Sequence, residues 1–200
     1  NFTYIAALKP KMAFIIDIRR GNLDLHLMYK ALFELSKDRA EFVSRLFSKK
    51  RPEGLGPKST AREIFTAYAA VQTSDDLYKE NLKAIEDHLV DKHGFALSAD
   101  DISGIEYVYG AFHRFGLGIN YSSTSGGFGG FGRVTYANLM TENDGKGQNR
   151  GYLASEENFT FLKELETKNL LVPVIGDFAG PKAIRAVGKY LKEIDGTVSA

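Results

Sequence analysis

The chain lacks several features that would define its class at once. Its 200 residues include no cysteine, which excludes disulfides, cysteine-metal sites and a thiol nucleophile. The 26 basic and 25 acidic residues leave a net charge of +1, too little to attract nucleic acid or an acidic membrane. No run reaches the roughly 18 apolar residues of a membrane span, and nothing resembles a signal peptide. We therefore expect a cytoplasmic protein with no nucleic-acid or membrane partner.

The composition is that of a globular protein, with 44% hydrophobic and 26% charged residues. A chain of this length can bury a substantial core, and one domain over residues 1–200 is the simplest organisation. The helical segment 2–8 follows Asn1 directly, and residues 197–200 resemble the first half of a strand. We therefore expect a single α/β domain that is truncated at both ends. The oligomeric state stays open.

Two apolar runs predict buried strands. The first, Met12–Ile18, does not alternate in polarity and carries Asp17 at its end; the second, Leu170–Ile175, is followed by Asp177. Such runs are typical of central strands in parallel sheets, and ligands bind beyond the carboxyl ends of such strands. We predict that the two strands are parallel neighbours whose carboxylates face one crevice. The alternative is that each Asp is an ordinary turn residue.

Helical periodicity and capping residues account for most of the remaining chain. Either Ser59 or Thr60 caps the helix that follows, and Thr60 as the cap would place Glu63 at the capping-box position. Pro181 stands at a favoured first helical position. Several helices fall between the two strand signals, and we interpret residues 38–116 as a helical insertion on an α/β core. The predicted helices are 2–8, 23–36, 38–48, 60–71, 75–92, 98–115, 135–140, 155–168 and 182–193.

A glycine-rich segment, residues 116–132, follows the predicted insertion. Glycine at this density does not favour a rigid strand, and its spacing matches no phosphate-binding fingerprint. One interpretation is a mobile lid over 122–132, with Phe128 and Phe131 docking over a ligand. The alternative is a flexible excursion without a ligand.

Other candidate residues surround the predicted crevice or lie on helices. Arg19 and Arg20 could bind a carboxylate or phosphate, or could pair with Asp17. Gly176 would let the backbone approach a ligand closely. His113 lies on one face of a predicted helix with Glu106 and Tyr109, so it could act as a general base, although an amphipathic helix edge produces the same pattern. The four histidines, His26, His88, His93 and His113, show no metal-ligand spacing, and we expect no metal site.

Residues 1–8 together with Met12–Arg20 resemble the stretch after the first glycine-rich loop of class I S-adenosylmethionine-dependent methyltransferases. Residues 14–20, 153–159 and 176–182 together resemble an uncharacterised bacterial family with such a core. The resemblance implies a three-layer, Rossmann-like, mostly parallel sheet that carries the helical insertion. It also implies methyl transfer from S-adenosylmethionine, with a small-molecule substrate as an acceptor that the sequence does not identify.

On this resemblance, Asp17 binds the ribose hydroxyls of the cofactor, and Asp177 lies near the reacting end. The implied cofactor-binding residues are Asp17, Ile18, Arg19, Gly176 and Phe178, and the implied catalytic residues are Asp177 and His113. Two alternatives remain open. An acid at the end of a strand serves NAD(P)-dependent oxidoreductases equally well, and a non-catalytic nucleotide-binding or scaffold protein can keep such a fold without the chemistry.

Overall fold

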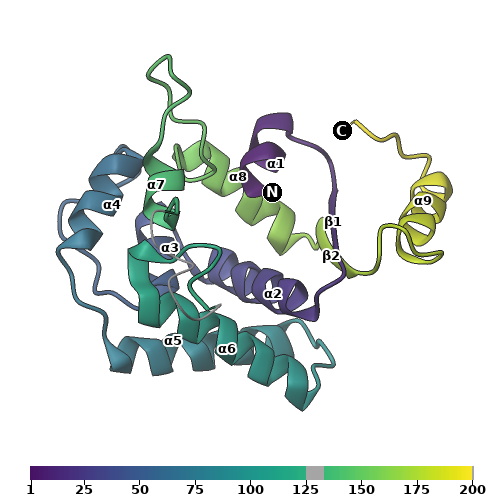
Figure 1. Ribbon diagram of the computed structural model, residues 1–200, viewed down its shortest axis with the longest axis horizontal. Helices are drawn as coiled ribbons and strands as arrows, with labels where there is room; N and C mark the ends of the chain where they lie inside the picture. Colours follow the sequence, from purple (N-terminus) through teal and green to yellow (C-terminus); the bar gives the residue numbers. More distant parts are fainter. Residues whose placement is uncertain (125–132, 200) are drawn as a thin grey trace.

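The computed structural model describes residues 1–124 and 133–199. Phe128, Phe131 and most of the predicted lid lie outside the described residues. Within them the chain is mostly helical (Figure 1). The elements in chain order are α1 (Phe2–Leu8), β1 (Ala13–Asp17), α2 (Arg20–Leu35), α3 (Arg39–Leu46), α4 (Ala61–Ala69), α5 (Asp75–Asp87), the π-helical turn η1 (His88–Lys92), α6 (Ala99–Phe115), the 3₁₀ turn η2 (Gly116–Gly118), α7 (Tyr136–Thr141), α8 (Glu156–Thr167), β2 (Leu171–Ile175) and α9 (Ala183–Glu193).

Several helices begin where their capping residues predict. At the start of α4, the Thr60 hydroxyl accepts a hydrogen bond from the Glu63 amide at 3.2 Å, and the Glu63 carboxylate accepts one from the Thr60 amide at 2.7 Å. Ser98 and Asp101 form the same reciprocal box before α6. These contacts satisfy amide groups that have no partner within the helix. The side chain of Asn1, by contrast, makes no capping bond to α1.

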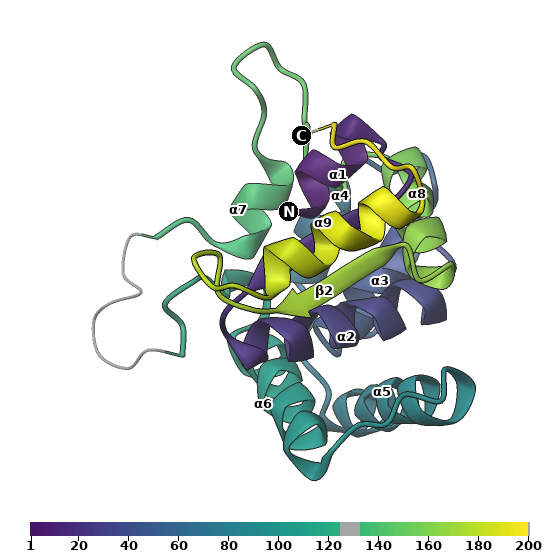
Figure 2. The same ribbon diagram turned by 90° about the vertical axis from the view of Figure 1, so that its right-hand side faces the viewer.

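Helix α2 is the centre of the core. It packs against α6 on one side and α8 on the other (Figure 2), and Met28, Leu32 and Phe33 on it are completely buried. The Phe33 ring lies 4.6 Å from that of Phe42 on α3 and 5.3 Å from that of Phe159 on α8. Burying such rings contributes about 1.5–3 kcal/mol each, so this aromatic cluster joins segments that are distant in sequence.

The two strands form a parallel pair, as predicted. Their register runs from Ala13 opposite Leu171 to Asp17 opposite Ile175. Helix α2 contacts both strands, whereas α9 lies on the side of the strands away from the helical body (Figures 1 and 2). The carboxyl ends of β1 and β2 therefore lie together at one edge of this small sheet.

The expected three-layer, Rossmann-like sheet is wrong. The described residues contain one sheet of two strands. The helices between residues 38 and 116 are also no insertion on an α/β core, because they bury their apolar faces against α2 and one another. The sequence contains two apolar runs of the strand type, and these form the two strands. Only the resemblance to methyltransferases implied further strands, and no apolar run supports them. None of the helices in the described parts of the chain is both long and apolar enough to cross a membrane.

Candidate functional site

The carboxyl ends of β1 and β2 bring together most of the site residues predicted from sequence. The amide of Gly176 donates a hydrogen bond to the Asp17 carbonyl at 2.9 Å, so the turn after β2 begins beside the end of β1. Asp17 is half-buried and Asp177 is exposed. Ile18 and Phe178 are also exposed, at 64% and 63%. We name this group, Asp17–Arg19 and Gly176–Phe178, the strand-end site.

Both aspartates of the strand-end site shape their own turns. Asp17 Oδ1 accepts from the Arg19 amide at 2.8 Å, and Asp177 Oδ1 accepts from the Ala179 amide at 2.9 Å. Such side-chain-to-backbone bonds are common for Asp after a strand. In each carboxylate the turn uses Oδ1, and Oδ2 makes no hydrogen bond to any of the described residues.

Gly176 is needed for close packing at this edge. A Cβ atom on Gly176 would lie 2.2 Å from the Cβ of Ala183, the first residue of α9. That distance is far below van der Waals contact, so only glycine lets α9 begin this close to the end of β2. Gly176 therefore brings a helix against the strand, and its close approach to a ligand stays a prediction.

The two arginines that follow β1 have different partners, and neither side chain pairs with Asp17. Arg19 Nη2 donates to the Tyr121 hydroxyl at 2.8 Å, and the Arg19 guanidinium lies 5.9 Å from the Tyr121 ring centre. This hydrogen bond is the main cause that raises the pKa of Arg19. Arg20 forms an ion pair with Asp101 in the first turn of α6.

Tyr121 is a neighbour of the strand-end site that the sequence did not reveal. It follows η2 and is 78% exposed, and its contact with Arg19 is made across a long separation in sequence. The Tyr121 ring and the Arg19 guanidinium form a surface next to Asp17 that can stack on a planar ligand and pair with its anionic groups.

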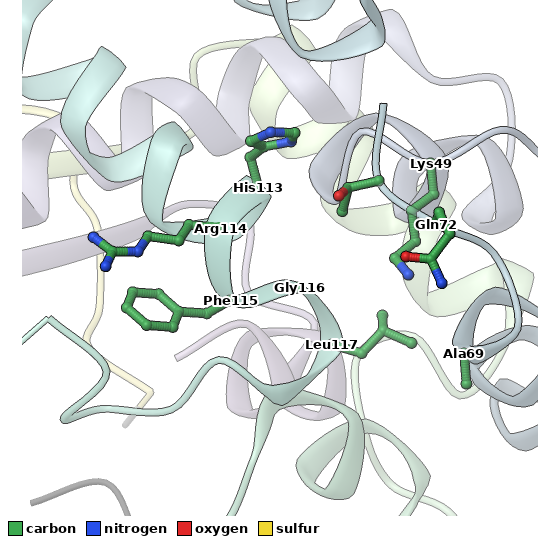
Figure 3. A pocket seen from close by; sticks show the side chains of 9 residues that line it. Lys49, Ala69, Gln72, His113, Arg114, Phe115, Gly116 and Leu117 are labelled. Carbon is green, nitrogen blue, oxygen red and sulfur yellow. The ribbon is translucent and has the colours of Figure 1, made fainter. Parts of the chain in front are cut away.

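His113 does not belong to the strand-end site. It lies near the end of α6, about 18 Å along the helix from Asp101, and its Nε2 is 3.1 Å from Asp75 Oδ1. With Lys49, Gln72 and Leu117 it lines an open pocket of about 310 Å³ (Figure 3). The lysine is not free to act there, because its ammonium donates to the carbonyls of Tyr68 and Val71 at the end of α4.

The helix face that carries His113 is mainly structural. Tyr109 is fully buried, and its hydroxyl donates to the Arg45 carbonyl at 2.7 Å and lies 2.9 Å from the Ser48 hydroxyl. Burial raises the pKa of Tyr109 to about 12. Tyr78 stacks between Tyr109 and His113, with ring centres 5.1 and 4.7 Å away. The spacing of Tyr109 and His113 therefore reflects packing of α6 against α5.

A second polar cluster lies at the junction of α2 and η1. Glu34 Oε2 is 3.0 Å from Nε2 of His88 and 3.0 Å from Nε2 of His93. One nitrogen or oxygen from each residue lies within 4.8 Å of those from the other two. The sequence spacing of the histidines gave no indication of this arrangement, because Glu34 lies far away in the sequence.

Comparison with known families gives a match over almost the whole chain. The model of a domain of unknown function, DUF7790, matches residues 1–199. The chain belongs to this DUF7790 family. No curated protein and no solved structure matches the chain. Family membership therefore adds no activity to what the geometry supports.

Proposed function

We propose that the strand-end site binds the nucleoside part of a small-molecule cofactor, and that S-adenosylmethionine is the first candidate, used for methyl transfer to a small-molecule acceptor. The observation that carries the proposal is the pairing of the β1 and β2 ends, which sets the half-buried Asp17 carboxylate beside the turn at Gly176. Carboxylates at the ends of parallel strands bind ribose hydroxyls in many nucleotide-binding proteins. The proposal rests on this local arrangement and not on a Rossmann-like sheet.

The chemistry of the neighbouring residues supports a nucleoside ligand. Asp17 supplies an acceptor for the hydroxyl groups, while the exposed Phe178 and Tyr121 rings supply apolar surface for a base. Arg19 lies against Tyr121 and can pair with a carboxylate such as that of the methionine part. The near-neutral charge of the chain favours a small ligand over nucleic acid.

Isothermal titration with S-adenosylhomocysteine tests the proposal. Asp17→Asn keeps an oxygen that accepts from the Arg19 amide, but it replaces the second carboxylate oxygen, which would accept from the ribose hydroxyls, with an uncharged NH₂ group. Since a hydrogen bond to a charged group contributes about 1.5–3 kcal/mol, we expect the variant to bind at least about tenfold more weakly. Asp87→Asn, which alters an exposed carboxylate paired with Lys83 on α5, is the matched control and should bind as the wild type does.

The pattern of binding separates the competing functions. Equal affinity of wild type and Asp17→Asn would remove Asp17 from the site. Absence of binding to the wild type would contradict the methyltransferase proposal, and a parallel titration with NAD⁺ then tests the oxidoreductase alternative. Binding of the homocysteine compound without methyl transfer to any acceptor would favour a non-catalytic nucleotide-binding protein.

A further inference from the structure

A buried carboxylate and two imidazoles meet where η1 packs against the end of α2. The side chains of Glu34, His88 and His93 are 2%, 7% and 11% exposed. Both imidazole Nε2 atoms approach the same oxygen, Glu34 Oε2, at 3.0 Å. A buried carboxylate between two histidines can form a hydrogen-bond network, and the same three residues can bind a metal ion.

The π-helical turn is what brings the two histidines together. Residues five apart on an α-helix point about 140° away from each other. In η1 the His93 amide instead donates to the His88 carbonyl at 3.2 Å, which is the hydrogen bond of a π turn. The wider turn puts both rings toward Glu34, with ring centres 5.2 Å apart. Phe95 stacks on the His93 ring at 5.2 Å and holds it in place.

We propose that Glu34, His88 and His93 bind a divalent transition-metal ion of the Zn²⁺ class. Two imidazole nitrogens and one carboxylate oxygen form the three-residue set that holds Zn²⁺ in many catalytic sites, where water takes the fourth position. Metal–ligand bonds of about 2.0–2.1 Å in a tetrahedral site separate neighbouring ligand atoms by about 3.3 Å. The observed 3.0 Å contacts need only a small outward shift to admit an ion.

Two lysines contact Glu34, one at each carboxylate oxygen. Lys30 Nζ lies 2.8 Å from Oε1, and its side chain is 6% exposed; it also donates to the Glu166 carbonyl. Lys30 therefore binds Oε1 of the Glu34 carboxylate and leaves Oε2 to the ion, as outer partners of metal ligands do. Lys92 Nζ lies 3.3 Å from Oε2 on a side chain that is 59% exposed. This ammonium competes with the ion and moves into water when the ion binds.

The fourth coordination position then lies on the side that the Lys92 ammonium vacates. That side faces solvent, so water or a ligand can reach the ion there. Imidazole ligands favour Zn²⁺, Co²⁺ or Ni²⁺ over Mg²⁺ and Ca²⁺, which take oxygen ligands. The site is independent of the strand-end site, because it uses the far end of α2.

Titration of the chelator-treated protein with Zn²⁺ by calorimetry, and with Co²⁺ by visible absorption, tests the proposal. We expect one ion per chain, d–d absorption bands with Co²⁺, and no binding of Mg²⁺. His93→Ala should weaken Zn²⁺ binding at least tenfold. His113→Ala is the matched control, because His113 also places Nε2 beside one carboxylate, at 3.1 Å from Asp75. The His113→Ala variant should bind Zn²⁺ with the affinity of the wild type.

Lys92→Ala should change the affinity for Zn²⁺ in the opposite direction. The exposed lysine can be removed without disturbing the core, and loss of the competing ammonium should tighten Zn²⁺ binding severalfold. Absence of stoichiometric binding to the wild type would overturn the proposal. Equal affinities of wild type, His93→Ala and Lys92→Ala would do the same, since binding would then occur elsewhere on the chain.

Discussion

Arg39 shows how a single charged residue can join distant parts of this protein. Its side chain is 2% exposed, and its Nε donates to the Glu156 carboxylate at 2.9 Å. The remaining guanidinium nitrogens donate to the carbonyls of Leu153, Pro57 and Ser59. A planar group with five donors can satisfy several carbonyls at once. The start of α3 is thereby tied to the loop before α4 and to the start of α8.

His26 is a residue whose burial should make stability depend on pH at mildly acidic pH. It is 5% exposed and packs 5.4 Å from the Phe2 ring. Its Nδ1 has no hydrogen-bond partner within the described part of the chain. Burial is the main cause that lowers the pKa of His26 to about 4, from an ordinary value of 6.5. The folded protein therefore holds this imidazole neutral.

The sign of the pH effect follows from this pKa. Between about pH 6.5 and 4 the unfolded chain binds a proton that the folded chain does not, so stability falls as the pH falls. We expect the free energy of unfolding of the wild type to decrease by about 2 kcal/mol between pH 7 and pH 5 on account of His26 alone. Urea unfolding at both pH values should show a smaller decrease for His26→Phe than for the wild type or His113→Phe. Equal decreases in all three proteins would contradict the assignment.

At the scale of the element, local signals predict helices well and miss their irregularities. Residues 75–92 are predicted as one helix, whereas the structure divides them into α5 and the π turn η1. The periodicity of α5 continues through Leu89, which is completely buried, so the pattern does not show the extra residue in the turn. The π turn depends on what the histidines meet on α2, and no residue near it in sequence encodes that contact.

The capping box of α4 provides an element-scale test. Thr60→Ala removes both the hydroxyl acceptor of the Glu63 amide and a donor to the Glu63 carboxylate. We expect a loss of about 1 kcal/mol in the free energy of unfolding, measured by urea denaturation. Thr66→Ala, at an exposed position inside the same helix, is the control; it should be neutral or slightly stabilising because alanine favours helix. Similar losses in both variants would show that the cap contributes nothing specific.

The whole molecule consists of a well-packed helical body and a lightly attached carboxyl-terminal helix. Helix α9 buries only Ala183, and Tyr190 reaches the sheet through an edge contact with Phe14 at 5.8 Å. Ile184 and Ile194 are 45% and 50% exposed. By contrast, the similar-sized α8 buries Phe159, Leu162, Leu165 and Glu166.

Hydrogen exchange followed by mass spectrometry should reveal this difference. We expect the amides of α9 to exchange much faster than those of α8, because opening α9 exposes little apolar surface and local opening costs correspondingly little free energy. The amides of α2, at the centre of the core, should be the slowest. Protection of α9 equal to that of α8 would show that α9 is held by contacts stronger than those described.

The sequence by itself determined the helices, most of their ends and the two parallel strands. These depend on the spacing of apolar residues and on caps such as Thr60 with Glu63, which act over a few positions in the chain. It also indicated that Asp17, Gly176 and Asp177 share one edge, because parallel neighbours place their carboxyl ends together. Whether that edge binds a nucleoside stays a prediction.

Only the tertiary structure decided how the elements combine. The helices of residues 38–116 bury their faces against α2, and the sheet formed by the described residues has two strands and not the larger number expected. The contact of Arg19 with Tyr121 and the meeting of Glu34 with His88 and His93 are likewise set by packing. Such contacts depend on which complementary surfaces bury the most apolar area together, and that is a property of the folded chain that no local pattern contains.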